Sequence, residues 1–154
     1  MSTTTEGATP GFLVWRLSMK WRVAVDRAVG PEGLTHAQYS LLASLYGMAR
    51  SGRQPSQREL ADHTGLEALY VSKLARTLEG SGLIERTRDA ADTRAVRLSL
   101  TEHGREVTGR AIGIVQELHA RFLAPLGGPG SPRVTAFTAE LAALLETPLD
   151  PDLA

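Results

Sequence analysis

Hydrophobic residues recur at helical spacing along most of the chain, and in one region they alternate instead. The first periodic segment covers about residues 11–29, where apolar side chains form two stripes. The first stripe contains Val14, Leu17, Trp21, Ala24 and Ala28, and the second contains Phe12, Trp15 and Met19. A helix that is apolar on two faces needs two packing partners. The second face is therefore either buried in the chain's own core or covered by a second subunit.

A break at residues 30–33 precedes the next predicted helix. Thr35 and Gln38 form a capping box, in which each side chain can bind a backbone amide of the other residue. The buried stripe is expected to contain Leu41, Leu42, Leu45 and Met48 or Ala49. Residues 50–53 end this helix.

Two short helices joined by a tight turn come next. Ser56 and Glu59 form a second predicted capping box, and Gly65 ends the first helix. The second helix covers about residues 67–79. Its expected buried residues are Leu66, Val71, Leu74 and Leu78, and its expected outward residues are Ala68, Leu69, Ser72, Lys73 and Arg76, with Tyr70 at the edge. Helices joined so closely must cross steeply, as in a helix-turn-helix motif.

Residues 83–87 and 95–100 alternate partially between apolar and polar positions, which predicts a β-hairpin. The loop between these strands contains Arg88, Asp89, Asp92 and Arg94. Thr101 is expected to cap a long helix to about residue 123, and a last helix covers about residues 133–145. The pattern predicts a mainly α fold with one small antiparallel β-hairpin.

Composition narrows the class of protein. The chain has 154 residues, enough for one domain with a real core, and no cysteine, which excludes disulfides, Cys-ligated metals and thiol redox sensing. No apolar segment is long enough to span a membrane. Residues 1–9 lack the apolar stretch of a secretion signal, and we interpret residues 1–10 as a disordered tail.

The net charge of zero argues weakly against a nucleic-acid partner, but the charged residues are unevenly distributed along the chain. Residues 50–100 contain nine basic and seven acidic residues, a net charge of +2, and the remainder contains eight and ten, a net charge of −2. This excess favours nucleic acid only if the positive side chains share a face.

An exposed helix beside a basic hairpin matches the two grooves of duplex DNA. Ser72, Lys73 and Arg76 can contact bases or phosphates, and Ala68 or Leu69 can touch a thymine methyl group. Arg94 can enter the minor groove, with its side chain held extended by Asp92. The backbone amides at Gln57 and Arg58 can bind a phosphate. The alternatives are a solvated amphipathic helix and an ordinary polar loop, and the helix-turn-helix spacing favours the DNA interpretation.

Catalytic chemistry has little support. The histidines at positions 36, 63, 103 and 119 are scattered over separate predicted helices, without the spacing of metal ligands. There is no glycine-rich phosphate loop and no nucleophile with a base nearby in the sequence. The sequence therefore predicts no enzyme activity, no cofactor and no metal.

Six motifs occur together in the segment Leu34–Gly104. They are Leu34-Thr35-x-x-Gln38-x-x-Leu41-Leu42, Ser56-x-x-Glu59-Leu60-Ala61, Val71-Ser72-Lys73-Leu74, Glu79-x-x-Gly82-Leu83-Ile84, Asp92-Thr93-Arg94 and Arg97-Leu98-Ser99-Leu100-Thr101-x-x-Gly104. In this order and spacing they resemble the MarR family of winged helix-turn-helix transcriptional regulators. Three departures concern the start of the second helix of the motif. Tyr70 stands where the family commonly has a small hydroxyl residue, and Glu67 and Leu69 make this start less polar and less basic than usual.

The resemblance implies a cytoplasmic, nucleoid-associated homodimer that represses transcription from a pseudo-palindromic DNA operator. Residues 11–33 and 102–147 would form a helical dimerisation lobe, and residues 34–101 the winged-helix DNA-binding lobe. The expected DNA-binding residues are Gln57, Ala68, Leu69, Tyr70, Ser72, Lys73, Arg76, Arg88, Asp92 and Arg94. A winged-helix protein-interaction module without DNA binding is the alternative, which the basic side chains of Lys73, Arg76 and Arg94 disfavour.

Members of this family often bind small aromatic ligands between the two lobes. The matching positions are Trp15, Met19, Trp21, His36 and Tyr39. Aromatic residues at helical spacing are also typical of a protein core, and both interpretations stay open.

Overall fold

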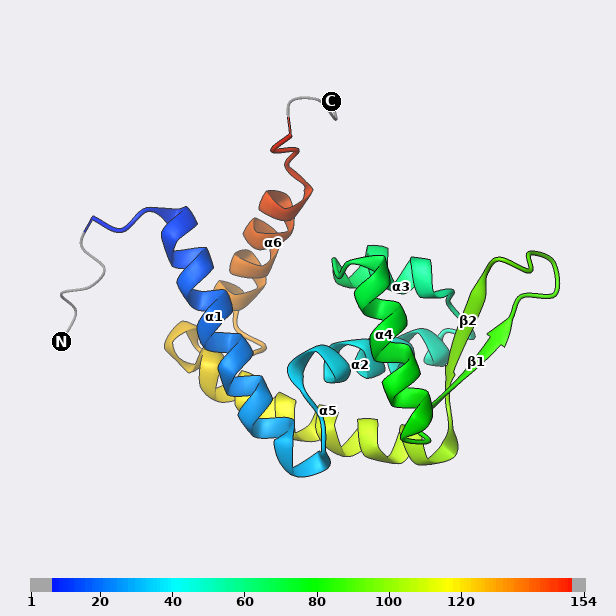
Figure 1. Cartoon of the computed structure of the whole chain (residues 1–154). Helices are drawn as coiled ribbons and strands as arrows, with labels where there is room; N and C mark the ends of the chain where they lie inside the picture. The colour runs from blue at the N-terminus through cyan, green and yellow to red at the C-terminus, as the bar shows by residue number, and fades with distance from the viewer. Residues whose placement is uncertain (1–6, 151–154) are drawn as a thin grey trace. The chain divides into compact units, whose positions relative to one another are not determined.

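A computed structural model of the chain describes residues 7–150 (Figure 1). The elements in chain order are α1 (Pro10–Val29), η1 (Gly30–Glu32), α2 (His36–Arg50), α3 (Gln57–Thr64), α4 (Ala68–Gly80), β1 (Ile84–Arg88), β2 (Val96–Leu100), α5 (Glu102–Leu123), η2 (Ala124–Leu126) and α6 (Pro132–Glu146). This order confirms the predicted mainly helical fold with one antiparallel hairpin. Residues 1–6 of the predicted tail lie outside the described residues, and Pro10 already belongs to α1.

The chain divides into two compact units, residues 1–115 and residues 116–154. The core of the first unit is built from aliphatic side chains of successive elements. Its fully buried members include Val25 and Val29 of α1, Leu41, Leu42 and Leu45 of α2, Leu60 of α3, Val71 and Leu78 of α4, Ile84 of β1 and Leu98 of β2. Burial of this apolar area is the main stabilising contribution to the fold.

Helix α1 is buried only near its C-terminal end. Val25 and Val29 are fully buried, whereas every residue from Gly11 to Lys20 is exposed. Val14 and Leu17 of the first stripe are exposed in this half, as are Phe12, Trp15 and Met19 of the second. Both apolar stripes are therefore uncovered over the first half of the helix.

The three side-chain caps that the sequence predicts, at Thr35, Ser56 and Thr101, are all present. Thr35 and Gln38 form the complete capping box of α2, with both reciprocal hydrogen bonds present. Ser56 caps α3 by accepting a hydrogen bond from the amide of Glu59 at 3.1 Å. The second half of that predicted box is wrong, because the Glu59 carboxylate instead pairs with Arg53 and Arg97. Thr101 accepts a hydrogen bond from the amide of Gly104 at the start of α5.

The helix-turn-helix consists of α3 and α4, separated by a short turn in which Gly65 has a φ of +73°. This left-handed conformation favours glycine. The α4 residues Val71, Leu74, Ala75 and Leu78 are buried as a stripe. Leu66 was predicted to be buried and Ser72 to be exposed, but both are half-buried.

Strands β1 and β2 form the wing, which lies beside α3 and α4 in Figure 1. Their register pairs Ile84 with Leu100 and Arg88 with Val96. The backbone also ties β2 to the segment before α3, because the amide of Leu98 donates to the carbonyl of Pro55 at 2.9 Å. This bond fixes the base of the wing against the helix-turn-helix.

Gly104 lies where the start of α5 meets the chain before β1. A Cβ atom at this position would stand 1.9 Å from the carbonyl oxygen of Leu83. Two further bonds hold the junction: the amide of Thr101 donates to the Leu83 carbonyl at 3.1 Å, and the Thr101 hydroxyl donates to the Gly82 carbonyl at 2.7 Å. Only glycine allows this close backbone approach.

The second unit contains the end of α5, η2 and α6. Gly127 and Gly128 have φ angles of +94° and +91° in the turn between the helices, and Ser131 caps α6. The last turns of α6 expose apolar side chains, including Leu144 at 60 % and Leu145 at 89 %. Within the described residues, no helix has the length and hydropathy needed to cross a membrane.

Candidate nucleic-acid interface

The outward face of α4 carries most of the residues that were predicted to contact DNA. Ala68, Leu69, Tyr70, Lys73 and Arg76 are exposed, opposite the buried stripe of the same helix. Ser72 is half-buried, and its hydroxyl accepts a hydrogen bond from Nη2 of Arg76 at 3.2 Å. Because the two residues are four positions apart, this bond holds the guanidinium along the helix surface.

The tip of the wing carries Arg88, Asp92 and Arg94, all exposed. Arg88 donates to the carbonyl of Thr93 across the loop at 3.3 Å. The Asp92 carboxylate accepts a hydrogen bond from the backbone amide of Arg94 at 3.0 Å. Asp92 therefore fixes the loop backbone, whereas the sequence predicted a contact with the Arg94 side chain. The guanidinium of Arg94 is left available at the surface.

Arg97 donates three hydrogen bonds: one within the wing, one to the segment before α3 and one to α3 itself. Its Nε donates to Oδ2 of Asp89 at 2.6 Å, and its Nη1 donates to the carbonyl of Gln54 at 2.9 Å and to Oε1 of Glu59 at 3.4 Å. Glu59 also pairs with Arg53 at 3.5 Å. One guanidinium thus joins β2, the wing loop and the first turn of α3, and we refer to Arg97, Asp89, Gln54 and Glu59 as the wing clamp.

The wing clamp was missed in the sequence, although Asp89 was noted as a loop residue. Arg97 is 38 positions from Glu59 in α3 and 43 positions from Gln54 in the segment before α3. Motif spacing contains no signal for such a contact. The only available hint is that position 97 places an arginine within a strand that continues into the buried Leu98 and Leu100.

Charge and hydrogen bonding hold the Asp89 carboxyl in its ionised form. The amide of Ala91 donates to it at 2.8 Å, and this bond, followed by that from Arg97, lowers the pKa of Asp89 below its ordinary value. The same pairing raises the pKa of Arg97. The pair of Asp89 and Arg97 therefore stays charged throughout the physiological range.

The wing should loosen only in strong acid. A carboxyl with a lowered folded-state pKa stabilises the fold above its unfolded pKa of about 3.9, and that contribution is lost as the pH falls through the lower folded value. Hydrogen exchange of the Ala91 amide, measured across that range, should show this loss of protection. Asp89→Asn should expose the same amide at neutral pH and remove the pH dependence. Equal protection in both proteins at every pH would contradict the role given to Asp89.

An open groove of ≈ 970 Å³ separates α3 and the start of α4 from the wing. Gln57, Arg58 and Asp62 line it from α3, and Asp92 and Arg94 line it from the wing loop. Gln57 is half-buried, and its Oε1 atom has no hydrogen-bond partner. Four of the predicted DNA-binding residues thus line the groove, since Ala68 also borders it beside Gln57, Asp92 and Arg94.

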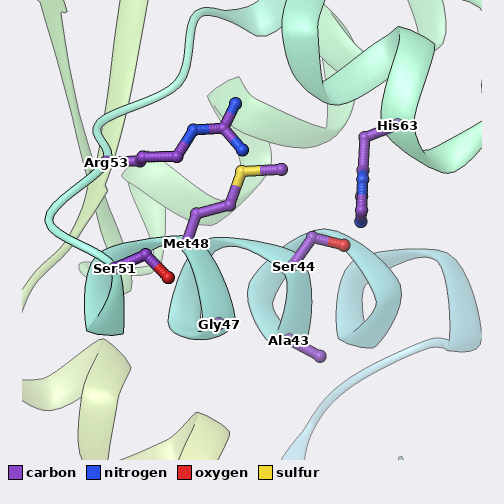
Figure 2. A pocket seen from close by; sticks show the side chains of 7 residues that line it. All are labelled: Ala43, Ser44, Gly47, Met48, Ser51, Arg53 and His63. Atoms are coloured by element: carbon purple, nitrogen blue, oxygen red, sulfur yellow. The ribbon is translucent and has the colours of Figure 1, made fainter.

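A second, smaller pocket of ≈ 400 Å³ lies between α2 and α3 (Figure 2). Figure 2 shows Ser44 and Met48 on α2, Ser51 and Arg53 on the segment that follows this helix, and His63 on α3. None of the five residues proposed to contact an aromatic ligand lines either of these two pockets.

The candidate ligand residues occupy two kinds of environment. Trp15 and Met19 are exposed on α1, at 58 % and 45 %. Trp21, His36 and Tyr39 are half-buried. Burial lowers the pKa of His36, against the opposing effect of Asp26, and raises the pKa of Tyr39. The amide of His36 donates to Oδ1 of Asp26 at 2.6 Å, which ties α1 to the start of α2.

The fold, with Lys73 and Arg76 exposed on α4 and Arg94 exposed on the wing, is that of a winged helix-turn-helix protein. Residues 32–95 match the sequence model of the MarR family. An uncharacterized HTH-type transcriptional regulator from Bacillus subtilis, YdcH, is 39 % identical over 116 residues, covering 75 % of this chain and 79 % of that protein. The HTH-type transcriptional repressor Mb2911 from Mycobacterium bovis is 30 % identical over 126 residues, covering 80 % and 86 %.

A solved structure shares the fold over almost its whole length. The S. aureus MepR–DNA complex superposes with a TM-score of 0.77 at 25 % identity, covering 90 % of this chain and 97 % of MepR. The chain belongs to the MarR family of transcriptional regulators, and it is not an enzyme.

Proposed function

We propose that this protein is a homodimeric repressor that acts at the nucleoid in the cytoplasm and binds a pseudo-palindromic DNA operator. The observation that carries the proposal is the placement of Lys73 and Arg76 on the outward face of α4, with Arg94 exposed at the wing tip. The relationship to a mycobacterial repressor and to a DNA-bound regulator supports it.

In this proposal each α4 enters one of two successive major grooves, with centres about 34 Å apart. Arg94 and Arg88 of each wing contact the adjacent minor groove, where a narrow groove concentrates negative potential. Gln57 and the first turn of α3 face a phosphate. Residues 34–101 form the DNA-binding lobe, and residues 11–33 and 102–147 form the dimerisation lobe.

Selection of bound sequences from random duplex DNA tests the proposal. Recovery of an inverted repeat with half-sites about one helical turn apart supports it. Recovery of no preferred sequence, together with no affinity for mixed duplexes, would instead favour a winged-helix module that contacts other proteins.

Operator binding should weaken steeply with added salt. Neutralised phosphates release counterions, so the logarithm of the binding constant falls with the logarithm of the salt concentration by about 0.9 for each phosphate contact. Fluorescence anisotropy of a labelled operator between roughly 50 and 200 mM salt measures this slope. Lys73→Gln should reduce the slope by about one for each subunit's contact. A flat response in the unmodified protein would rule out the phosphate contacts.

The exposed apolar residues of α1 support the dimer. Val14 is 49 % exposed, and its neighbours Leu13 and Leu17 are uncovered as well. Contiguous apolar surface of this kind is typical of a subunit interface. Val14→Glu should therefore give a monomer in sedimentation analysis and abolish tight operator binding, because the two half-sites could no longer be bound together. Lys20→Glu on the same helix is the control and should remain dimeric. A Val14→Glu protein that still sediments as a dimer would exclude α1 from the interface.

We further propose that a small aromatic molecule releases the protein from its operator. Half-buried Trp21, His36 and Tyr39 would form one side of the ligand site, and Trp15 and Met19 the other. Tryptophan fluorescence titration with benzoate and phenol derivatives tests this step, and a ligand that quenches fluorescence should also lower operator affinity.

A further inference from the structure

Leu69 is the most exposed large apolar side chain among the described residues of the first unit. It is 78 % exposed, against 58 % for Trp15, the next in that unit. We propose that Leu69 reads the 5-methyl group of a thymine in the major groove of each operator half-site. This inference rests on the proposed function and adds a base preference to it.

The position of Leu69 on α4 places it at the centre of the outward face. An α-helix has 3.6 residues per turn, so residues 69, 73 and 76 fall on one side. Val71, Leu74, Ala75 and Leu78 fall on the opposite side and are all buried. Nothing in the core requires an aliphatic side chain at position 69, and its conformation leaves it in the solvent.

The chemistry of the neighbouring residues selects the partner. Lys73 and Arg76 share the face with Leu69, which favours a polyanion over an apolar protein surface. Leucine cannot form hydrogen bonds with base edges. The thymine methyl group is the apolar feature of the major groove that it can contact. Leu69 also lies in the first turn of α4, and the N-terminal residues of a recognition helix reach the base edges.

The bond between Arg76 and Ser72 places a guanidinium close to Leu69 on the outward face. Nη2 of Arg76 donates to the hydroxyl of Ser72 at 3.2 Å, so the guanidinium lies over the turn of Ser72, three residues after Leu69. At about 1.5 Å per residue this separation is about 4.5 Å along the helix axis, or roughly one base-pair step of about 3.4 Å. Arginine most often pairs with guanine. The half-site should therefore contain a guanine within about one or two base pairs of the thymine.

Single-atom changes in the operator test the proposal with the full-length protein. Each thymine of the selected operator is replaced by deoxyuridine, which removes only the methyl group, and the affinity is measured by anisotropy. At one symmetric pair of thymines, each methyl group that is removed should lower the affinity for the operator about fourfold. Leu69→Ala should bind the thymine and deoxyuridine operators equally, and Leu69→Met should keep the preference.

The outcomes separate this inference from the proposed function. If no duplex is selected, the proposed function fails. If an operator is selected but no thymine methyl matters, or if Leu69→Ala still discriminates, the assignment of Leu69 is wrong while DNA binding stands. Because Leu69 is exposed, the alanine variant should keep the wild-type thermal melting curve, which confirms that the loss is local.

Discussion

Arg94→Ala is expected to weaken operator binding by about 1–3 kcal/mol for each wing, which is roughly 5- to 150-fold from one contact. The guanidinium at the wing tip would lose its place in the minor groove, where negative potential is strongest. Because a dimer carries two wings, the total loss should exceed that of a single contact. Anisotropy with the selected operator measures the effect.

The Arg94 variant should keep its fold and its dimeric state. The side chain is exposed, and the loop conformation depends on the Asp92 carboxylate and the backbone amide of residue 94, which alanine retains. Arg121→Ala removes the same charge from an exposed position on α5 and serves as the control, with affinity close to that of the unmodified protein. Equal affinities for the two variants would exclude the wing tip from the interface.

The second large effect is expected for stability. Gly104→Ala places a Cβ atom 1.9 Å from the carbonyl oxygen of Leu83, so that either α5 or the chain before β1 must move. Overpacking of this kind costs about 1–3 kcal/mol, and more when the neighbour is backbone. The melting temperature should fall by roughly 2–4 °C for each kcal/mol.

Gly109→Ala is the matched control on the same helix. A Cβ atom at Gly109 meets nothing within 4 Å. Alanine should therefore stabilise α5 by about 0.5–1 kcal/mol, because glycine is a poor helix former. If Gly104→Ala melts at or above the temperature of Gly109→Ala, the close approach to Leu83 does not limit the packing of α5.

Local signals in the sequence were sufficient for most of the fold. The cap at Thr35, the turn at Gly65 and the alternating strands each depend on neighbouring residues, and each was predicted correctly. The outward face of α4 followed from helical periodicity, since Lys73 and Arg76 lie opposite the buried stripe. Ser72 is the exception, because its half-burial depends on packing around the helix.

Long-range contacts account for what the sequence did not predict. Glu59 was assigned to a local capping box, but Arg97 approaches it from a strand 38 positions away and pairs with it instead. The Asp92 contact is local by contrast: its carboxylate accepts from the backbone amide of Arg94, and residue types alone do not distinguish such a bond from a side-chain pair. Periodicity also could not predict that α1 is only partly buried, because it identifies the apolar faces of a helix but not what covers them.

The wing clamp has a consequence for how such a regulator changes shape. Since Arg97 connects β2 to the segment before α3 and to α3 itself, the hairpin and the reading helices should reorient as a single body. In the proposed dimer, a signal that releases DNA must then change the distance between the two DNA-binding lobes, because neither lobe can bend. The affinity for operators with altered spacing between half-sites should accordingly fall steeply, because neither DNA-binding lobe can deform to reach a displaced groove.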